Sequence, residues 1–308
     1  MPARKTKSLL ATLIWEGLGI CEKCNKWTGF LMMGFRVGIL LLLLYPLDLC
    51  AQTVPNIYAP TTWSSACLHF GNRERDRIFT DYANLYNQHN VKNFGVALLG
   101  AGILANTKMD GNFQNWYQDR VRTNATDDLS KFFKTFGEGQ YFIPIMAVSA
   151  LTYRFLQEKP VIQECFLGEF TDRTFRGYLV GAPALLILQP TLGAGRPTMG
   201  SSHWHPFRRA NAVSGHAFMG AVPFITAAQM TDQPCVKGLL YALSGFTAWS
   251  RVNDDAHYLS QAILGWYLAY LSVRAVSSTE EMRLLPRGLT LFPVCESGSA
   301  GIGFYYQF

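Results

Sequence analysis

The sequence predicts an all-α protein, a helical bundle that ends in a short β-hairpin. Apolar segments of helical rather than strand length recur along the chain and are separated by polar turns. They cover residues 94–105, 141–153, 178–188, 217–230, 238–249 and 258–273. The composition changes from Leu289 to Phe308, where the chain is rich in glycine and aromatic residues and has β-propensity. This last stretch is typical of a hairpin, and we expect it to pack on the bundle.

Residues 1–52 resemble a signal peptide or an uncleaved signal-anchor. Basic residues extend to Arg36, the stretch from Val37 to Leu47 is almost wholly apolar, and Ala51 ends a possible cleavage site. We therefore expect an exported protein, periplasmic or in the cell-envelope membrane, with its functional site facing outward.

The rest of the chain divides into three predicted regions. Residues 53–135 form a polar, N-terminal helical region, 136–280 form the core, and 281–308 form the hairpin-like tail. The charged run Arg73–Arg77 is expected on a solvated helix face. The polar stretch 110–134, which carries several aromatic residues, is expected to cover the site or to lie on a membrane surface.

Charge and hydropathy limit the partners. The formal net charge is +6, and part of it belongs to the basic leader, so the rest gives no reason to expect nucleic acid. Uncharged windows of about the 20 residues that a membrane span needs occur near 177–195, 210–231 and 256–273. Polar residues dilute them, and mean hydropathy is barely above zero. We favour a soluble or membrane-surface bundle over a polytopic one.

The stretch 250–261 carries the first chemical signal. His257 and Gln261 are four residues apart at the start of an apolar run, so we expect them to be adjacent on one helix face. An imidazole next to an acceptor oxygen is held by one ring nitrogen, and the other nitrogen is free to react. Arg251 precedes them and offers a fork of donors suited to phosphate.

Two further stretches add to this signal. Ser214, Gly215 and His216 open the apolar run at 217–230, and the first N–H groups of a helix favour an anion. Upstream, a glycine-rich loop delivers Arg196, which is followed by a proline. Two arginines, a helix start and two histidines predict phosphoryl transfer without a metal: one histidine attacks phosphorus and the other protonates the leaving oxygen.

These motifs resemble those of the type 2 phosphatidic acid phosphatase (PAP2) superfamily, which includes the vanadium haloperoxidases. Its pattern is Lys-x6-Arg-Pro, then Pro-Ser-Gly-His, then Ser-Arg-x5-His-x3-Asp. Arg196-Pro197, Ser214-Gly215-His216 and Ser250-Arg251-x5-His257 match it in order and spacing. The family lysine is replaced by Gln189 and the family aspartate by Gln261. The resemblance implies a helical bundle of the PAP2 and haloperoxidase type, with region 136–280 as its phosphatase core.

The resemblance also implies roles. Phosphate is held by Arg196, Arg251, Ser214, Gly215 and the position of Gln189; His257 attacks, His216 is the acid, and Gln261 orients His257. We expect a phosphatase without cofactor or metal, acting through a phosphohistidine on phosphorylated lipids or small exported phosphate esters and pyrophosphates. A membrane surface is the expected partner. Because two charged positions are neutral, we expect weakened activity. The alternatives are a vanadate-dependent haloperoxidase and a non-catalytic phosphate- or lipid-binding envelope protein.

Simpler roles compete at some positions. Ser214 and Gly215 have a helix cap as their alternative role, which is compatible with anion binding. Asp254 and Asp255 are expected to cap the helix that carries His257, with a carboxylate behind His257 as the alternative. His203 and His205 lie in a loop between the motifs, where an exposed or substrate-facing pair is favoured over a metal pair.

Overall fold

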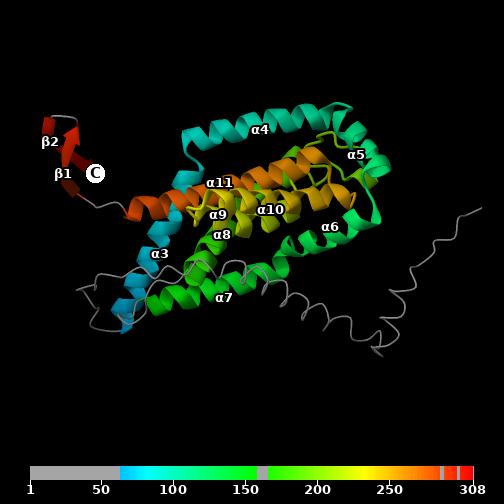
Figure 1. Ribbon diagram of the computed structural model, residues 1–308. Coiled ribbons are helices and arrows are strands. Elements are labelled where there is room, and N and C mark those ends of the chain that lie inside the picture. The colour runs from blue at the N-terminus through cyan, green and yellow to red at the C-terminus, as the bar shows by residue number, and fades with distance from the viewer. Residues whose placement is uncertain (1–62, 158–165, 285–287, 297–298, 308) are drawn as a thin grey trace, which may run out of the picture. The chain divides into compact units, whose positions relative to one another are not determined.

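The structure is a computed structural model that describes residues 63–157, 166–284, 288–296 and 299–307 (Figure 1). The predicted leader, residues 1–52, lies outside this part of the chain, and the predicted boundaries after residues 52, 135 and 280 stay predictions. The described helices are α3 (Trp63–Leu85), α4 (Gln88–Asn106), α5 (Met109–Arg120), α6 (Asn124–Phe136), α7 (Gly139–Gln157), α8 (Phe166–Leu192), the 3-10 helix η3 (Pro197–Met199), α9 (Gly215–Gln229), α10 (Pro234–Asn253) and α11 (Leu259–Leu284).

The helical bundle that the sequence predicted is confirmed. Each of the six predicted apolar segments lies within one helix, apart from Met230, which immediately follows α9, and Tyr258, which immediately precedes α11. At the end of the chain, strands β1 (Gly288–Glu296) and β2 (Ser299–Gln307) pair antiparallel, with Gly288 opposite Gln307 and Glu296 opposite Ser299. That this hairpin packs on the bundle stays a prediction.

Helix α9 lies at the centre of the bundle and packs against α8, α10 and α11 (Figure 1). It is apolar on all sides, as a helix surrounded by others must be. Every residue from Ala217 to Ala228 is buried. Full burial of a side chain such as Phe218 or Ile225 contributes about 1.5–3 kcal/mol. The start of α9 is therefore held in a fixed place, and the candidate site is built on it.

The charged run Arg73–Arg77 forms only in part the solvated helix face that the sequence predicted: Arg75 and Asp76 are exposed and pair with each other at 3.0 Å. Arg77 is buried and forms ion pairs with Glu74, Asp172 and Glu280, at 2.9, 2.9 and 2.6 Å. The carboxylates of Asp172 and Glu280 come from α8 and α11, far along the chain. For Arg77 the prediction was wrong, because a run of charged residues has the same composition whether water or another helix neutralises its charges.

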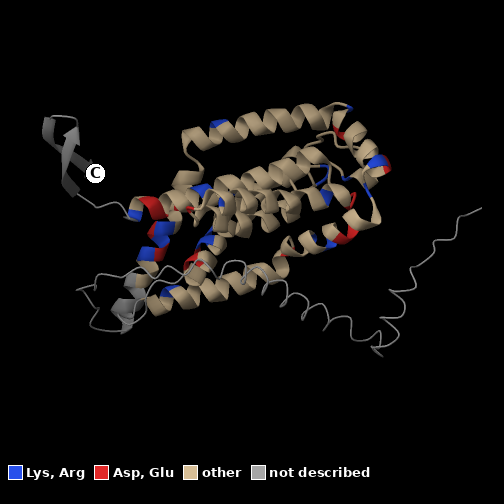
Figure 2. Ribbon diagram, viewed as in Figure 1, with Lys and Arg blue, Asp and Glu red and all other residues tan. Residues whose placement is uncertain are grey.

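Several helices expose apolar side chains along their outer faces. On α4 and α7 these include Val96, Leu99, Ile103, Val148 and Leu151, all more than half exposed. Charged residues gather towards the helix ends, with long uncharged stretches between them (Figure 2). Among the described residues, only the stretch Phe166–Met199 is long and apolar enough to be a candidate membrane span.

Candidate active site

His257 and Gln261 meet as the sequence predicted, although not on one helix. α11 begins at Leu259, so His257 lies in the turn just before it. Its Nδ1 atom is 2.8 Å from Gln261 Oε1, and both side chains are buried. Because this oxygen accepts, Nδ1 carries the proton and Nε2 keeps its free electron pair. The geometry leaves Nε2 as the reactive nitrogen.

The Gln261 amide makes a second contact that the sequence did not indicate. Its Nε2 atom donates to the backbone oxygen of Gly195 at 2.7 Å, which fixes the orientation of the amide. Gly195 precedes Arg196. The backbone oxygen of Gln261 also accepts from Ser214 N at 3.0 Å. Gln261 thus connects His257 to the loop of Arg196 and to the start of α9.

Close packing brings α9 and α11 together at this point. A Cβ atom on Gly265, one turn after Gln261, would lie 2.3 Å from Ser214 O. Only glycine therefore allows the contact. The same approach places Ser214, Gly215 and His216 beside the His257 turn.

The turn from Arg251 to His257 is closed by its own backbone. The carbonyl oxygen of Arg251 accepts from Ala256 N at 3.0 Å and from His257 N at 3.1 Å. Asp255 takes a left-handed backbone conformation, with φ of 54°, that aspartate tolerates better than most residues. Its carboxylate accepts from Gln114 Nε2 of α5 at 2.7 Å. The turn therefore fixes the nucleophile candidate next to Arg251.

Arg251 is buried with most of its donors unused. The residue is 5% exposed, and its Nε and Nη1 atoms have no hydrogen-bond partner among the described residues. Its remaining ion pair joins Nη2 to Asp254 Oδ2 at 3.3 Å, and Asp254 in turn accepts from Ser130 Oγ at 2.6 Å. Burial lowers the pKa of Arg251 below its ordinary value, and Arg196 adds to this effect. An uncompensated buried guanidinium is costly unless an anion binds it.

The other two predicted phosphate ligands on this side lie close by. Arg196 is exposed, and its Nε donates to Asn211 Oδ1 at 3.0 Å. Gln189 donates from Nε2 to Val213 O at 3.0 Å and lies next to Gly215. Gln189 thus supports the loop that leads into α9, and its amide carries no charge for an anion.

Ser214 is the N-cap of α9, as one of the two sequence-based interpretations had it. Its hydroxyl accepts from Ala217 N at 3.3 Å and is fully buried. The side chain is therefore engaged in capping, and the backbone N–H groups of Gly215 and His216 are the ones at the open helix start.

Both histidines are surrounded by positive charge. Burial, then Arg251, Lys134 and Arg196, lower the pKa of His216 to about 4, while Asp254 acts in the opposite direction. The His216 side chain is exposed to solvent, so water screens part of this effect. Burial also lowers the pKa of His257 to about 4, although the Gln261 hydrogen bond favours the protonated form. Both imidazoles are neutral at pH 7 while the site holds no anion.

Asp254 and Asp255 do not cap the His257 helix, contrary to the prediction. Their carboxylates hold Arg251 and Gln114 instead, and neither is bonded to His257. The start of α11 is held by Asp110 of α5, whose carboxylate accepts from Ser260 N at 3.1 Å and from Ser260 Oγ. A sequence gives no sign of a cap that comes from a helix 150 residues away.

Helices α5 and α6 form hydrogen bonds to the end of α10 and to the turn after it. Asn253 accepts from Tyr117 at 3.1 Å and donates to Asp127 at 2.9 Å, and Ser130 donates to Ser250 O at 3.1 Å. The stretch 110–134, predicted to cover the site or to lie on a membrane, thus supports the site from behind Ser250 and Asn253.

His203 and His205 lie in an exposed loop with ring centroids 6.5 Å apart. Nowhere in the described residues do three His, Cys, Asp or Glu side chains gather in a group that could hold a metal ion. The metal pair stays the weaker interpretation.

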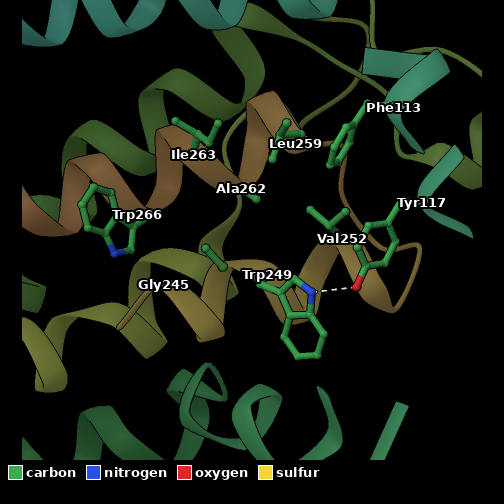
Figure 3. A pocket seen from close by; sticks show the side chains of 10 residues that line it. Phe113, Tyr117, Gly245, Trp249, Val252, Leu259, Ala262, Ile263 and Trp266 are labelled. Carbon is green, nitrogen blue, oxygen red and sulfur yellow. Dashed lines mark hydrogen bonds between the residues drawn. The ribbon is translucent and has the colours of Figure 1, made fainter. Parts of the chain in front are cut away.

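An apolar pocket of about 240 Å³ lies between α5, α10 and α11 (Figure 3). Figure 3 shows Trp249 donating to the Tyr117 hydroxyl at its edge, a bond of 2.7 Å. Val252 and Leu259 line the pocket and flank the turn that carries Arg251 and His257. The pocket offers space for hydrocarbon close to the charged site.

Fold and site together define a class: an α-helical bundle whose central helix begins at a cationic, histidine-bearing site. The family model described as PAP2 superfamily matches residues 146–284, a little under half of the chain. This region, which includes α8 to α11, matches the same superfamily that the motifs of the sequence resemble. The sequence-based family assignment is confirmed, and the two departures at Gln189 and Gln261 stay observations on this chain alone.

One solved structure is similar at a distance, a transmembrane PAP2 type phosphatidylglycerolphosphate phosphatase from Bacillus subtilis. It shares 11% sequence identity and has a TM-score of 0.38, over 71% of this chain and 96% of that one. This likeness is too remote to support a shared fold or activity. No curated protein matches the sequence of the chain.

Proposed function

We propose that this protein is a phosphatase that hydrolyses phosphorylated lipids through a phosphohistidine intermediate. The observation that carries the proposal is the buried Arg251 guanidinium with two unpaired nitrogen atoms, beside a histidine whose Nδ1 is held and whose Nε2 is free. A tetrahedral oxyanion satisfies the unpaired donors and places its central atom next to that free nitrogen.

In the first step, phosphate oxygens accept from Arg251, Arg196 and the N–H groups at the start of α9. The His257 Nε2 electron pair attacks phosphorus as the bond to the leaving oxygen breaks. His216 donates its proton to that oxygen, and the alcohol leaves. Bound phosphate offsets the positive charge that lowers the His216 pKa, so substrate binding itself favours the protonated acid.

In the second step, water attacks the phosphohistidine. Neutral His216 takes a proton from this water, and the bond between His257 Nε2 and phosphorus breaks. Phosphate leaves, and both histidines return to their starting states. His257 keeps its Nδ1 proton on Gln261 Oε1 throughout, so the Gln261 amide orients the ring without balancing its transient positive charge. Charge-assisted bonds are about twice as strong as neutral ones, and turnover is therefore slow.

A lipid is the favoured substrate because apolar surface lies both on the outside of the bundle and beside the site. The exposed apolar faces of α4 and α7 suit contact with hydrocarbon. The apolar pocket is lined by Val252 and Leu259, which flank the turn that carries Arg251 and His257 (Figure 3). We therefore propose membrane association, with the phosphate end of the lipid at the Arg251 side.

The test uses the full-length protein in detergent micelles and measures release of inorganic phosphate from phosphatidic acid, phosphatidylglycerol phosphate and a soluble phosphate monoester. His257→Ala is expected to abolish release, because His216, the other histidine of the described site, acts as the acid and lacks the hydrogen bond that holds the ring of His257. His203→Ala is the matched control, because that histidine is exposed and outside the site. A chelator is expected to leave the rate unchanged.

Activity of His257→Ala near the wild-type level would overturn the mechanism. A faster rate on the soluble ester than on either lipid would retain the phosphatase and reject the lipid preference. Phosphate binding without turnover would favour a non-catalytic binding protein, and bromide oxidation with added vanadate would favour a haloperoxidase.

A further inference from the structure

One face of helix α6 is aligned with the candidate site. Residues 127, 130, 134 and 137 follow at helical spacing, and residues so spaced lie on the same face. Asp127 contacts Asn253, and Ser130 contacts both Ser250 O and Asp254. These contacts direct the face towards the end of α10, where Arg251 lies.

The far end of this face reaches the start of α9. Gly137 is so close to His216 that a Cβ atom on it would lie 2.7 Å from His216 O and 3.0 Å from His216 Cβ. Lys134, whose carbonyl accepts from Gly137 N, lies between the Ser130 and Gly137 contacts. Because Ser130 contacts the residues on either side of Arg251 and Gly137 contacts His216, Lys134 lies on α6 between Arg251 and His216.

Lys134 is half-buried, and among the described residues its ammonium group has no hydrogen bond or ion pair. Lys131, on the adjacent turn, differs in both respects: it is exposed and pairs with Asp128 at 2.9 Å. The Lys134 charge acts on His216, where it ranks after burial and Arg251 among the causes that lower the histidine pKa. An unpaired cation in this place has the properties of an anion ligand.

We infer that Lys134 is a phosphate-binding residue of this site and supplies from α6 the cation that position 189 lacks. The inference rests on the proposed function and goes beyond it in one respect. Lys134 lies outside the segment that matches the superfamily, and the motif positions give no hint of it. The lysine charge reaches the phosphate from the His216 side, whereas Gln189 borders Gly215 from α8.

The experiment measures binding of inorganic phosphate to the full-length protein by calorimetry, so that the readout does not depend on turnover. Lys134→Gln keeps the length of the side chain and removes its charge. We expect its phosphate Kd to rise by about tenfold or more, the size expected for loss of one charge-assisted bond. Lys134→Arg is expected to stay within about threefold of the wild type, since it keeps the charge. Lys131→Gln is the matched control and is expected to bind as the wild type does.

A rescue variant sharpens the result. Adding Gln189→Lys to Lys134→Gln returns a cation to the site from α8, and we expect it to recover most of the lost affinity. Equal phosphate affinity in wild type and Lys134→Gln would overturn this inference alone. A wild type that binds no phosphate would overturn the proposed function and this inference with it. A loss of affinity shared by Lys134→Gln and Lys131→Gln would show a general charge effect and would also overturn the inference.

Discussion

Two clusters of arginine residues in the same bundle differ in how their charge is balanced. At the end where α3, α8 and α11 meet, Arg77 and Arg176 are buried among Asp81, Asp172 and Glu280. Arg176 donates to Asp81 through both Nε and Nη2, at 2.8 and 2.6 Å. At the candidate site, Arg251 is equally buried but has one carboxylate partner, and two of its nitrogen atoms have none.

The difference teaches that burial alone does not mark a functional arginine. In the first cluster the carboxylates that balance both arginine charges lie within the fold, although Nε of Arg77 also lacks a hydrogen-bond partner among the described residues. Although burial opposes it, Arg176 and Arg77 hold the pKa of Glu280 well below its ordinary value, so this carboxylate stays charged. In the second cluster the positive charge exceeds the negative, and an anion from outside would complete it.

The largest effect should come from paired substitutions in the two clusters. Arg176→Ala leaves Asp81 and Glu280 buried without their main partner, and we expect it to lower the free energy of unfolding by roughly 3–5 kcal/mol. Arg251→Ala removes a buried charge that the single ion pair with Asp254 compensates only in part, so we expect unchanged or higher stability. Its phosphatase rate should nonetheless fall by about 10²–10³-fold, as for loss of a transition-state donor.

Thermal unfolding and phosphate release, measured on both variants, give these values. The comparison fails if Arg251→Ala destabilises as much as Arg176→Ala, since Arg251 would then be a structural residue. It also fails if Arg251→Ala retains wild-type turnover.

A smaller effect is expected at Gln261, which connects the two sides of the cationic cluster. Gln261→Leu loses the bonds to His257 and Gly195, and at about 1 kcal/mol each we expect turnover to fall by roughly 10- to 100-fold. Gln261→Glu still accepts from His257 and adds the missing charge, but it cannot donate to Gly195 O. We expect it to have a higher kcat than Gln261→Leu and a higher KM than the wild type.

Gln229→Leu, at the far end of the central helix α9 and away from the site, serves as the control. Equal losses in all three variants would refute the bridging role.

The pH dependence should show the smallest effect, about tenfold for each pH unit. In the free enzyme, His216 must be protonated and His257 neutral, and both have a pKa of about 4. Arg251, Lys134 and Arg196 lower the His216 value and Asp254 raises it. Above pH 4 the protonated fraction of His216 falls as pH rises, so kcat/KM should increase as pH is lowered from 7 towards about 5. The kcat profile should be shifted to higher pH, because bound phosphate raises the His216 pKa. A kcat/KM that rises steadily from pH 5 to 8 would contradict the acid role.

The two clusters also show what sequence can and cannot predict. The ordered motifs around Arg196, His216 and His257 locate the site because their spacing within each segment is a local property. Partners from distant helices leave no such pattern. Nothing near Arg77 indicates that Glu280 neutralises it, and nothing near Arg251 indicates that Ser130 of α6 donates to Asp254, the ion-pair partner of Arg251. For the same reason the sequence does not indicate the role of Asp110, whose carboxylate caps the start of α11, far along the chain.

Gln261 shows a second limit of sequence. Its spacing from His257 predicts their hydrogen bond, even though α11 begins after His257 and not before it. The bond to Gly195 depends on how α8 and α11 approach each other, which no local pattern records. At position 261, where this chain departs from the family motif, the oxygen of the neutral amide binds His257 and its nitrogen binds Gly195.

The central claim is that His257, beside the unbalanced arginine cluster, forms a covalent bond to phosphorus. The most direct test is to mix the full-length protein with ³²P-labelled phosphatidic acid, quench in alkali, where phosphohistidine survives, and map the labelled peptide by mass spectrometry. The account predicts a label on His257 that is absent from His257→Ala and that persists longer in His216→Ala, where water attack lacks its base. Steady phosphate release by the wild type with no label on His257, or with the label on another residue, would contradict it.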